Sequence, residues 1–142
     1  TYRLYLTHPW LLRADCSRPC FGPNTLAGFD FLIGSLGGLG LTDQERVSVM
    51  ITLDGFVSGF ARQRLGHETA AELTGVSDEE FWATQYPTLE KAMLSGAYPT
   101  LAALAEDSFS LGWDESFEFG LARVLDGVAA LVEARRTDRP QP

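Results

Sequence analysis

Apolar residues recur at helical spacing near the end of the chain, between residues 117 and 132. Intervals of four and three residues place one set along a single side of a helix. This set comprises Phe117, Leu121, Val124, Val128 and Leu131. Gly120 and Gly127 lie two turns apart on a common side, and a glycine inside a helix costs about 1 kcal/mol relative to alanine. The pattern predicts a helix from Asp114, as its cap, to about Ala134, closely approached by another helix.

A second helix with two apolar sides is predicted in the middle of the chain. Thr42 and Glu45 have the spacing of a capping box, which predicts a helix from Asp43 to about Leu65, or as far as Leu73. One apolar side consists of Val47, Met50, Ile51, Asp54, Val57, Ser58, Ala61 and Leu65, and the other of Val49, Leu53, Phe56 and Phe60. A helix that is apolar on two sides is central in its domain or shared with a partner.

The remaining segments also have helical rather than strand patterns, and no run of alternating β-branched residues is bounded by turns. A helix over Thr1–Arg13 is expected to break at Pro9, and a helix capped by Asn24 is expected to end near Leu36, before a glycine-rich turn. The later helices are expected at Ser77–Leu94, opened by a second capping box of Ser77 and Glu80 and interrupted by Pro87, and at Pro99–Ala105. The predicted fold class is all-α.

Composition and charge narrow the class of protein. The chain has 142 residues, 45% hydrophobic and 21% charged, which is typical of one soluble globular domain. The net charge of −8 disfavours nucleic-acid binding by this segment, because binding to phosphates needs clustered Lys and Arg. The first residue is not Met, no signal peptide is visible, and no apolar run has the length of a membrane span. We therefore expect a fragment of a longer cytoplasmic protein with no membrane partner.

Candidate chemistry is sparse. Cys16 and Cys20, with His8 and His67, could be written as a zinc site, but the Cys spacing does not match the usual metal or redox motifs. We expect two free thiols, and a disulfide stays open. The run Gly34–Gly40 lacks the Lys and Ser/Thr of a phosphate-binding loop. No nucleophile, base and carboxylate occur at a catalytic spacing, so neither an enzyme nor a cofactor or metal is predicted.

Asp54 is the most informative single residue because it lies on an apolar side of the middle helix. A buried carboxylate costs several kcal/mol unless it is paired or hydrogen-bonded. Pairing with Arg62 or Arg123, exposure at the helix edge, and contact with a ligand are the three interpretations. The many aromatic side chains, together with Met50, could line a cavity between helices, although each is individually more typical of a core.

These residues resemble a known family. The segments that carry the resemblance are His8–Leu11, Gly22–Asn24, Leu53–Gly59, Tyr98–Leu101 and, most specifically, Phe117–Gly127. In this order they are similar to the C-terminal ligand-binding and dimerisation domain of the tetracycline-repressor (TetR) family of transcription regulators. The resemblance covers nearly the whole chain, so residues 1–142 are expected to form one such domain.

The resemblance implies a homodimer in which the middle and last helices form a four-helix seam with their copies. The seam residues would be Phe56, Phe60, Phe117, Gly120, Leu121, Val124, Val128 and Leu131. It also implies a cavity in each subunit for a small apolar or drug-like effector. The cavity residues would be Trp10, Phe29, Ile33, Met50, Asp54, Val57 and Trp82, with Asp54 as the polar orienting group. The family's magnesium site has no evident counterpart here.

Three functions are compatible with this reading of the sequence. The first is the sensor domain of a repressor that contacts DNA only through an N-terminal helix-turn-helix, for which this chain has no matching segment. The second is a stand-alone small-molecule-binding protein of the same fold. The third, an all-α enzyme, has no catalytic set to support it. An encoded helix-turn-helix upstream of Thr1 would separate the first from the second.

Overall fold

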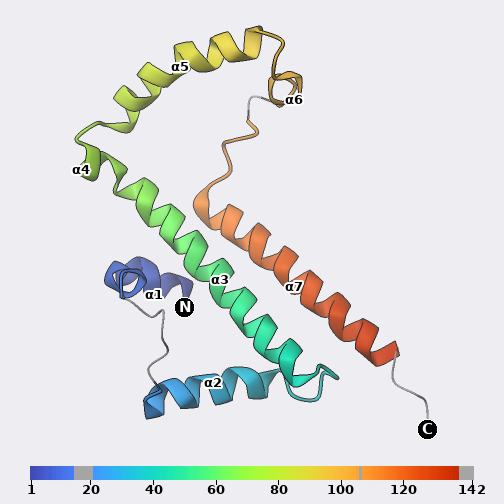
Figure 1. Ribbon diagram of the computed structural model, residues 1–142. Helices are drawn as coiled ribbons and strands as arrows, with labels where there is room; N and C mark the ends of the chain where they lie inside the picture. Colours follow the sequence, from blue (N-terminus) through green and yellow to red (C-terminus); the bar gives the residue numbers. More distant parts are fainter. Residues whose placement is uncertain (15–20, 106, 138–142) are drawn as a thin grey trace. The chain divides into compact units, whose positions relative to one another are not determined.

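The computed structural model describes residues 1–14, 21–105 and 107–137, and these residues form helices without strands (Figure 1). In chain order the elements are α1 (Tyr2–Thr7), the 3₁₀ helix η1 (Pro9–Leu12), α2 (Pro23–Ser35), α3 (Asp43–Glu68), α4 (Ala70–Thr74), α5 (Asp78–Leu94), α6 (Pro99–Ala102) and α7 (Trp113–Thr137). The predicted all-α class is confirmed. Cys16 and Cys20 lie outside the described residues.

The chain divides into two compact units. Unit 1 comprises Thr1–Gln63 and Phe117–Pro142, and unit 2 comprises Arg64–Ser116. Unit 1 therefore contains α1, η1, α2 and the greater part of α3 and α7. Unit 2 contains α4, α5 and α6 with the adjoining ends of the two long helices.

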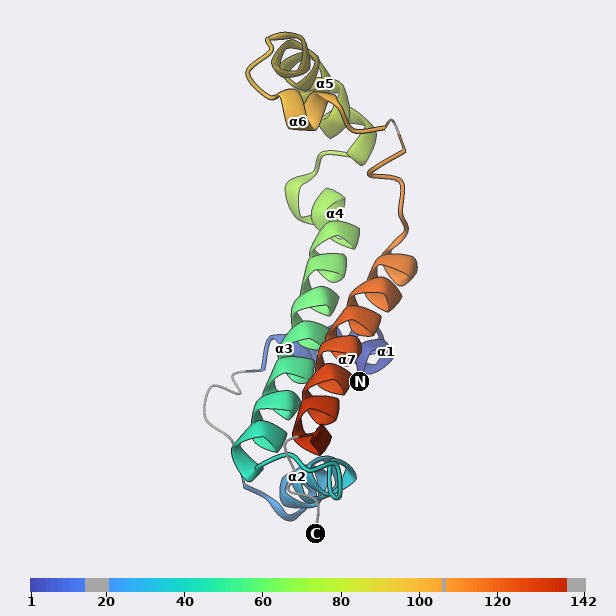
Figure 2. The same ribbon diagram turned by 90° about the vertical axis from the view of Figure 1, so that its right-hand side faces the viewer.

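In unit 1, α3 and α7 lie side by side and antiparallel, as both views show (Figures 1 and 2). An aromatic cluster formed by Tyr2, Phe56, Phe60 and Phe117 joins them. The Tyr2 ring stacks on Phe117 with centroids 3.8 Å apart, and the centroids of Phe56 and Phe60 lie 5.5 and 5.6 Å from that of Phe117. Phe117 is 7% exposed. The cluster thus packs α1, α3 and α7 around one buried ring.

Gly120 explains how the two long helices approach each other at this cluster. A Cβ atom at Gly120 would lie 2.7 Å from two ring atoms of Phe56, closer than a real Cβ contact. The expected close approach at this glycine is confirmed, and the neighbour belongs to the same chain. Around Gly127, Gly55 and Gly59 a Cβ atom would meet nothing within 4 Å.

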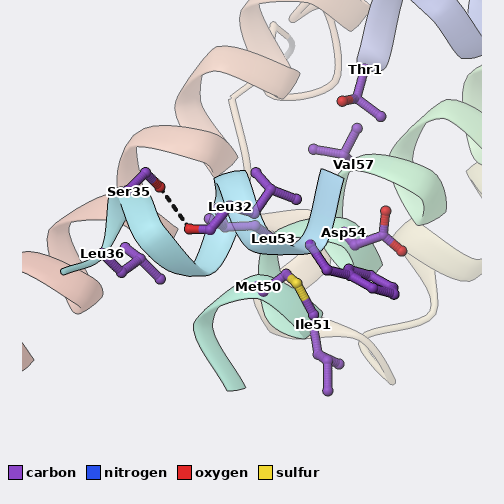
Figure 3. Close-up of a pocket in the computed structure, with 10 residues that line it drawn as sticks. Thr1, Leu32, Ser35, Leu36, Met50, Ile51, Leu53, Asp54 and Val57 are labelled. Atoms are coloured by element: carbon purple, nitrogen blue, oxygen red, sulfur yellow. Dashed lines mark hydrogen bonds between the residues drawn. The ribbon is translucent and has the colours of Figure 1, made fainter. Parts of the chain in front are cut away.

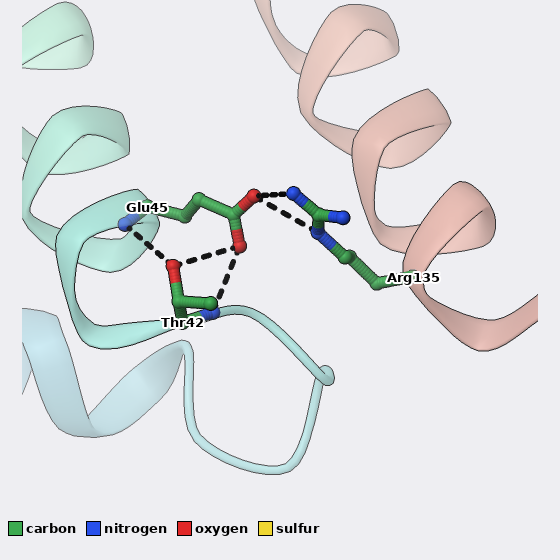
Figure 4. A network of polar contacts seen from close by, with 3 residues as sticks. All are labelled: Thr42, Glu45 and Arg135. Atoms are coloured by element: carbon green, nitrogen blue, oxygen red, sulfur yellow. Dashed lines mark hydrogen bonds and ion pairs between the residues drawn. The ribbon is translucent and has the colours of Figure 1, made fainter. Parts of the chain in front are cut away.

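A polar network joins the start of α3 to the end of α7 (Figure 4). The Thr42 N–H donates to Glu45 Oε2 at 2.8 Å and the Glu45 N–H to Thr42 Oγ1 at 3.3 Å, which is the predicted capping box. Arg135 Nε donates to Glu45 Oε1 at 2.9 Å, and the Arg135 Nη2 group adds a second bond. One carboxylate therefore caps α3 and holds α7.

The glycine-rich turn before Thr42 links α2 to this network. Gly38 and Gly40 have φ values of 75° and 82°, a left-handed conformation that glycine adopts without steric cost. Leu41, which follows them, is 4% exposed. The predicted stop signal for α2 is confirmed, although α2 ends at Ser35 rather than Leu36.

Unit 2 carries the second predicted capping box and an ion-pair network. The Ser77 N–H donates to Glu80 Oε2 at 3.1 Å and the Glu80 N–H to Ser77 Oγ at 3.2 Å, which opens α5. Arg64 bridges the carboxylates of Glu68 and Asp114, at 2.7 and 2.6 Å. This bridge ties the end of α3 to the start of α7.

Three local expectations are wrong. Pro87 does not interrupt α5, because its fixed φ suits a helix and the carbonyl of Ala83 merely lacks an N–H donor at Pro87 on this exposed element. Gly22, not Asn24, is the N-cap of α2, with Pro23 at its first position. Asp114 does not cap α7, which begins at Trp113 and holds Asp114 in its first turn.

Burial is limited in the single chain. The buried hydrophobic residues among those described are Leu41, Val49, Ala61, Phe117 and Val132, all in unit 1. Large apolar side chains remain exposed in both units, including Ile51 and Phe119 in unit 1 and Trp82 and Leu94 in unit 2. Because contiguous exposed apolar patches mark interaction sites, we expect part of this surface to be covered by a further molecule.

We expect Gly120→Ala to destabilise the fold. Overpacking against Phe56 costs about 1–3 kcal/mol, which outweighs the gain of about 1 kcal/mol in helix propensity. Gly28→Ala in α2 is the matched control, because nothing lies within 4 Å of that Cβ position, and it should be neutral or stabilising. Denaturant unfolding at fixed protein concentration measures both. Equal stability changes for the two variants would contradict the close packing of Gly120.

Glu45 should govern part of the acid stability. Its hydrogen bond from Arg135, followed by that from the Thr42 backbone, lowers the pKa of Glu45 from 4.5 to about 2. The stabilising contribution is therefore complete above about pH 4.5 and is lost as the pH falls towards 2. Glu45→Gln should lower the free energy of unfolding at neutral pH and flatten its fall across this pH range.

Glu80→Gln is the control for this experiment. Ser77 lowers the pKa of Glu80 in a similar capping box. Glu80 accepts hydrogen bonds from Ser77, which belongs to the same helix end, whereas Glu45 also joins two helices. We expect Glu80→Gln to change the free energy of unfolding less than Glu45→Gln does. If the free energy of unfolding of Glu45→Gln falls with decreasing pH in parallel with that of the wild type, the role of Glu45 is refuted.

Candidate ligand-binding site

A cavity of about 410 Å³ lies in unit 1 between α2 and α3, beside the start of α1 (Figure 3). Its lining consists of Thr1 from the start of the chain, Phe29, Leu32, Ser35 and Leu36 from α2 and the residue after it, and Met50, Ile51, Leu53, Asp54 and Val57 from α3. Most of these side chains are apolar. The volume falls within the range of small-molecule sites and the lining is similarly apolar, which makes the cavity a candidate ligand site.

Helical periodicity places these side chains on facing surfaces. Phe29, Leu32 and Leu36 are separated by three and four residues, so they form one stripe on α2. Met50, Asp54 and Val57 are separated by four and three residues and form the facing stripe on α3. The turn with Gly38 and Gly40 joins α2 to α3 and thereby fixes the two walls of the cavity.

Asp54 is the charged side chain among the described residues of this lining. It is exposed and forms no ion pair with a described residue. The two suggested partners are engaged elsewhere: Arg62 donates to the Leu12 carbonyl at 3.3 Å, and Arg123 pairs with Asp126 at 2.6 Å. Pairing of Asp54 with either arginine is therefore wrong; Asp54 is exposed at the helix surface, and its contact with a ligand stays a prediction.

Ser35 is a second polar side chain in the lining of the cavity. The Ser35 hydroxyl donates to the Leu32 carbonyl at 2.7 Å, so its proton is already used within α2. Its oxygen can still accept a hydrogen bond from a ligand. The cavity thus offers apolar contact along most of its walls and one carboxylate.

The structure brings together four of the seven predicted cavity residues: Phe29, Met50, Asp54 and Val57. Ile33 is half-buried but lies beside the stripe of Phe29 and Leu32 rather than on it. Trp10 is 64% exposed on η1. Trp82 belongs to α5 in unit 2, where its ring contacts those of Phe81 and Tyr86. Trp10 does not line the described cavity.

Sequence reasoning missed the lining residues Thr1, Leu32, Ser35, Leu36, Ile51 and Leu53. Leu32 and Leu36 could have been found, because they continue the helical spacing that starts at Phe29. Thr1 and Ser35 carried no such signal. Their position depends on how α1 and α2 are placed against α3.

The predicted seam residues fall into two groups. Phe56, Phe60, Phe117 and Gly120 pack against one another within the chain. Val124, Val128 and Leu131 line a hollow of about 370 Å³ between α3 and α7. The remaining lining of this hollow is Glu45, Ser48, Val49, Thr52, Arg123 and Gly127, and Leu121 is half-buried nearby on α7. The dimer seam itself stays a prediction.

The described residues offer neither a metal-binding cluster nor a membrane-spanning helix. His, Cys, Asp and Glu side chains do not gather there in groups of three that could hold a metal ion. Within the same residues, no helix combines the length and apolar composition needed to cross a bilayer.

We expect Val57→Trp to block the cavity. The added ring would fill space between α2 and α3, so a neutral fluorescent probe, N-phenyl-1-naphthylamine, should lose affinity on the order of tenfold. Val47→Trp is the matched control, because Val47 is on the same helix, is exposed, and does not line the cavity. Fluorescence titration measures both, and equal affinity of the two variants would show that the probe binds elsewhere.

Comparison with known proteins agrees with this architecture. The family model for the tetracyclin repressor-like C-terminal domain matches residues 1–132. The chain is also similar to the HTH-type transcriptional repressor DrrR1 of Streptomyces coeruleorubidus, with 46% identity over 136 residues. The match covers 96% of this chain and 50% of the relative, so the chain spans about half the length of that protein. The chain belongs to the family of tetracycline repressor-like C-terminal domains.

Proposed function

We propose that this chain is the effector-binding and dimerisation domain of a TetR-family transcriptional repressor. The observation that carries the proposal is the apolar cavity between α2 and α3, on a helix that also packs against α7. The name of the relative supports regulation of transcription, and this family of regulators supports the expectation that the chain is not an enzyme. We propose that the protein is cytoplasmic, because the operator DNA that a repressor binds would lie in that compartment.

The effector is proposed to be a small apolar or drug-like molecule. The lining of Phe29, Leu32, Met50, Leu53 and Val57 favours burial of an apolar body, at about 25 cal/mol per Å² of apolar area removed from water. No cofactor or metal is part of the proposal.

A homodimer is proposed to form over the outer side of α3 and α7. The apolar side chains Val124, Val128 and Leu131 line one side of the hollow, which also includes polar side chains such as Glu45 and Arg123, and the space around Gly127 is open. Obligate interfaces are large and apolar, and a helix from a second copy would bury this surface. Phe117, in contrast, is already buried by its own chain and contributes to the seam indirectly, by positioning α7.

Regulation follows from the double use of α3. A ligand changes an equilibrium only through different affinities for two arrangements of the protein. Met50, Asp54 and Val57 contact the cavity, whereas Val49 and Thr52 on the same helix line the hollow towards α7. A shift of α3 would therefore change the seam, and with it the spacing of two DNA-reading domains. Coupling of about 1–3 kcal/mol changes DNA affinity between several-fold and about a hundred-fold.

The stand-alone small-molecule-binding protein remains the second candidate. It would use the same cavity and would have no DNA-reading domain. The net charge of −8 disfavours tight DNA binding by the 142 residues in either case. DNA binding is therefore proposed for an N-terminal helix-turn-helix outside this chain.

We expect Val128→Glu to dissociate the dimer of the full-length protein. A carboxylate buried among the apolar side chains of the seam would cost several kcal/mol, and operator binding should fall with the dimer because two readers bind two half-sites. Ala130→Glu is the control, because Ala130 is exposed and does not line the hollow. Sedimentation velocity and a DNA-binding titration are measured together.

The outcomes of this experiment separate the candidate functions. A dimer that dissociates with loss of DNA binding supports the repressor. A full-length protein that never binds duplex DNA supports the stand-alone binding protein. An unchanged dimer in Val128→Glu contradicts the assignment of this hollow to the seam.

A further inference from the structure

We propose that Asp54 makes the cavity selective for amphipathic organic cations, in which an apolar body carries a protonated amine at one end. This inference rests on the proposed function of the cavity as a ligand site and names the class of ligand. It depends on the composition of the lining and on the position of Asp54 within it.

The composition leaves Asp54 without a counter-charge. Among the described lining residues, the other side chains are apolar or hydroxyl-bearing, and none carries a positive charge. Arg62 and Arg123 are engaged with Leu12 and Asp126, as described above. No described side chain of the lining therefore supplies a positive charge to the carboxylate when a ligand displaces its water.

This arrangement discriminates between ligands by charge. A neutral apolar ligand that covers Asp54 removes water from the carboxylate without replacing its hydrogen bonds. An anionic ligand adds repulsion to that cost. A protonated amine instead forms a charge-assisted hydrogen bond with the carboxylate, which is stronger than a bond between neutral groups.

The walls around the carboxylate also favour a cation. Phe29 offers an aromatic ring, which attracts a positive charge over its face, and Met50 offers a polarisable sulfur beside it. Both residues line the same cavity as Asp54. They would contact the part of the ligand next to the amine without competing for the carboxylate.

The position of Asp54 gives the ligand a direction. Figure 3 shows Asp54 on the side of the cavity towards Thr1 and Val57, and Ser35 and Leu36 at the opposite side. The amine would therefore bind at the Asp54 end. The apolar body would extend along α2 and α3 towards Leu36.

A matched series of fluorescent probes tests this selectivity on the full-length protein. The three probes share a dansyl group and a five-carbon chain, and the chain ends in an ammonium (dansylcadaverine), a methyl or a carboxylate group. We expect the wild-type protein to bind the ammonium probe about tenfold more tightly than the methyl probe and the carboxylate probe least tightly. Higher salt should reduce this preference, because the carboxylate is exposed.

Asp54→Asn should abolish the preference for the ammonium probe. The affinity for this probe should fall about tenfold, while the affinity for the methyl probe should change less than threefold. Asp30→Asn is the matched control, because it removes the same charge from an exposed position on α2 that does not line the cavity. Asp54→Glu keeps the charge and should retain part of the preference. Circular dichroism and thermal unfolding identify any variant that fails to fold.

The outcomes distinguish this inference from the proposed function. Equal binding of all three probes, blocked by Val57→Trp, would overturn the role of Asp54 and leave the cavity as a ligand site. A preference for the ammonium probe that Asp30→Asn reduces as much as Asp54→Asn would assign it to overall charge and also overturn the inference. Binding that Val57→Trp does not affect would contradict the cavity itself.

Discussion

The packing of Phe117 is the contact on which the rest of unit 1 depends. Its ring is stacked by Tyr2 and flanked by Phe56 and Phe60, so α1, α3 and α7 meet at one buried side chain. Aromatic pairs of this geometry contribute about 0.5–1.5 kcal/mol each beyond the area they bury. Gly120 makes the arrangement possible, because any side chain there would displace Phe56. The hydrogen bond from Arg135 to Glu45 then holds the end of α7 to the start of α3.

The cluster also sets how much apolar surface remains for other molecules. Once Phe56 and Phe60 face Phe117, the opposite side of α3 is left with Met50, Asp54 and Val57, and α2 covers that side only as a wall of the cavity. Val124, Val128 and Leu131 on α7 remain in an uncovered hollow. The few buried residues of the described chain are thus consistent with a domain whose stability includes a partner and a ligand. We attribute the excess apolar surface to the proposed dimer partner and ligand rather than to a defect of packing.

Local signals in the sequence predicted the helices better than they predicted their surroundings. The capping boxes at Thr42 and Ser77 act over three residues, so the sequence contains all the partners, and both are confirmed. The α7 pattern identified an apolar helix but could not say that Phe117 would be buried by its own chain. The predicted residues that the structure brings together at the cavity, such as Phe29 and Met50, lie on clear helical stripes. The prediction of Trp10 and Trp82 rests on their aromatic rings alone, which say nothing about the element they face: Trp10 is exposed on η1, and Trp82 contacts Tyr86 in unit 2.

The spacing of residues along α3 gives the proposed regulation a physical route. Asp54 and Phe56 are two residues apart, about 200° around the helix, so one lines the cavity while the other packs beside Gly120 and Phe117. Protein interiors are close-packed, and a helix in such contact moves as a body between discrete positions rather than deforming continuously. A ligand that pulled Asp54 or pushed Met50 would therefore have to move Phe56 against α7, or else be resisted by it. The same contact that holds the fold together would in this way set the difference in ligand affinity between two arrangements of the dimer.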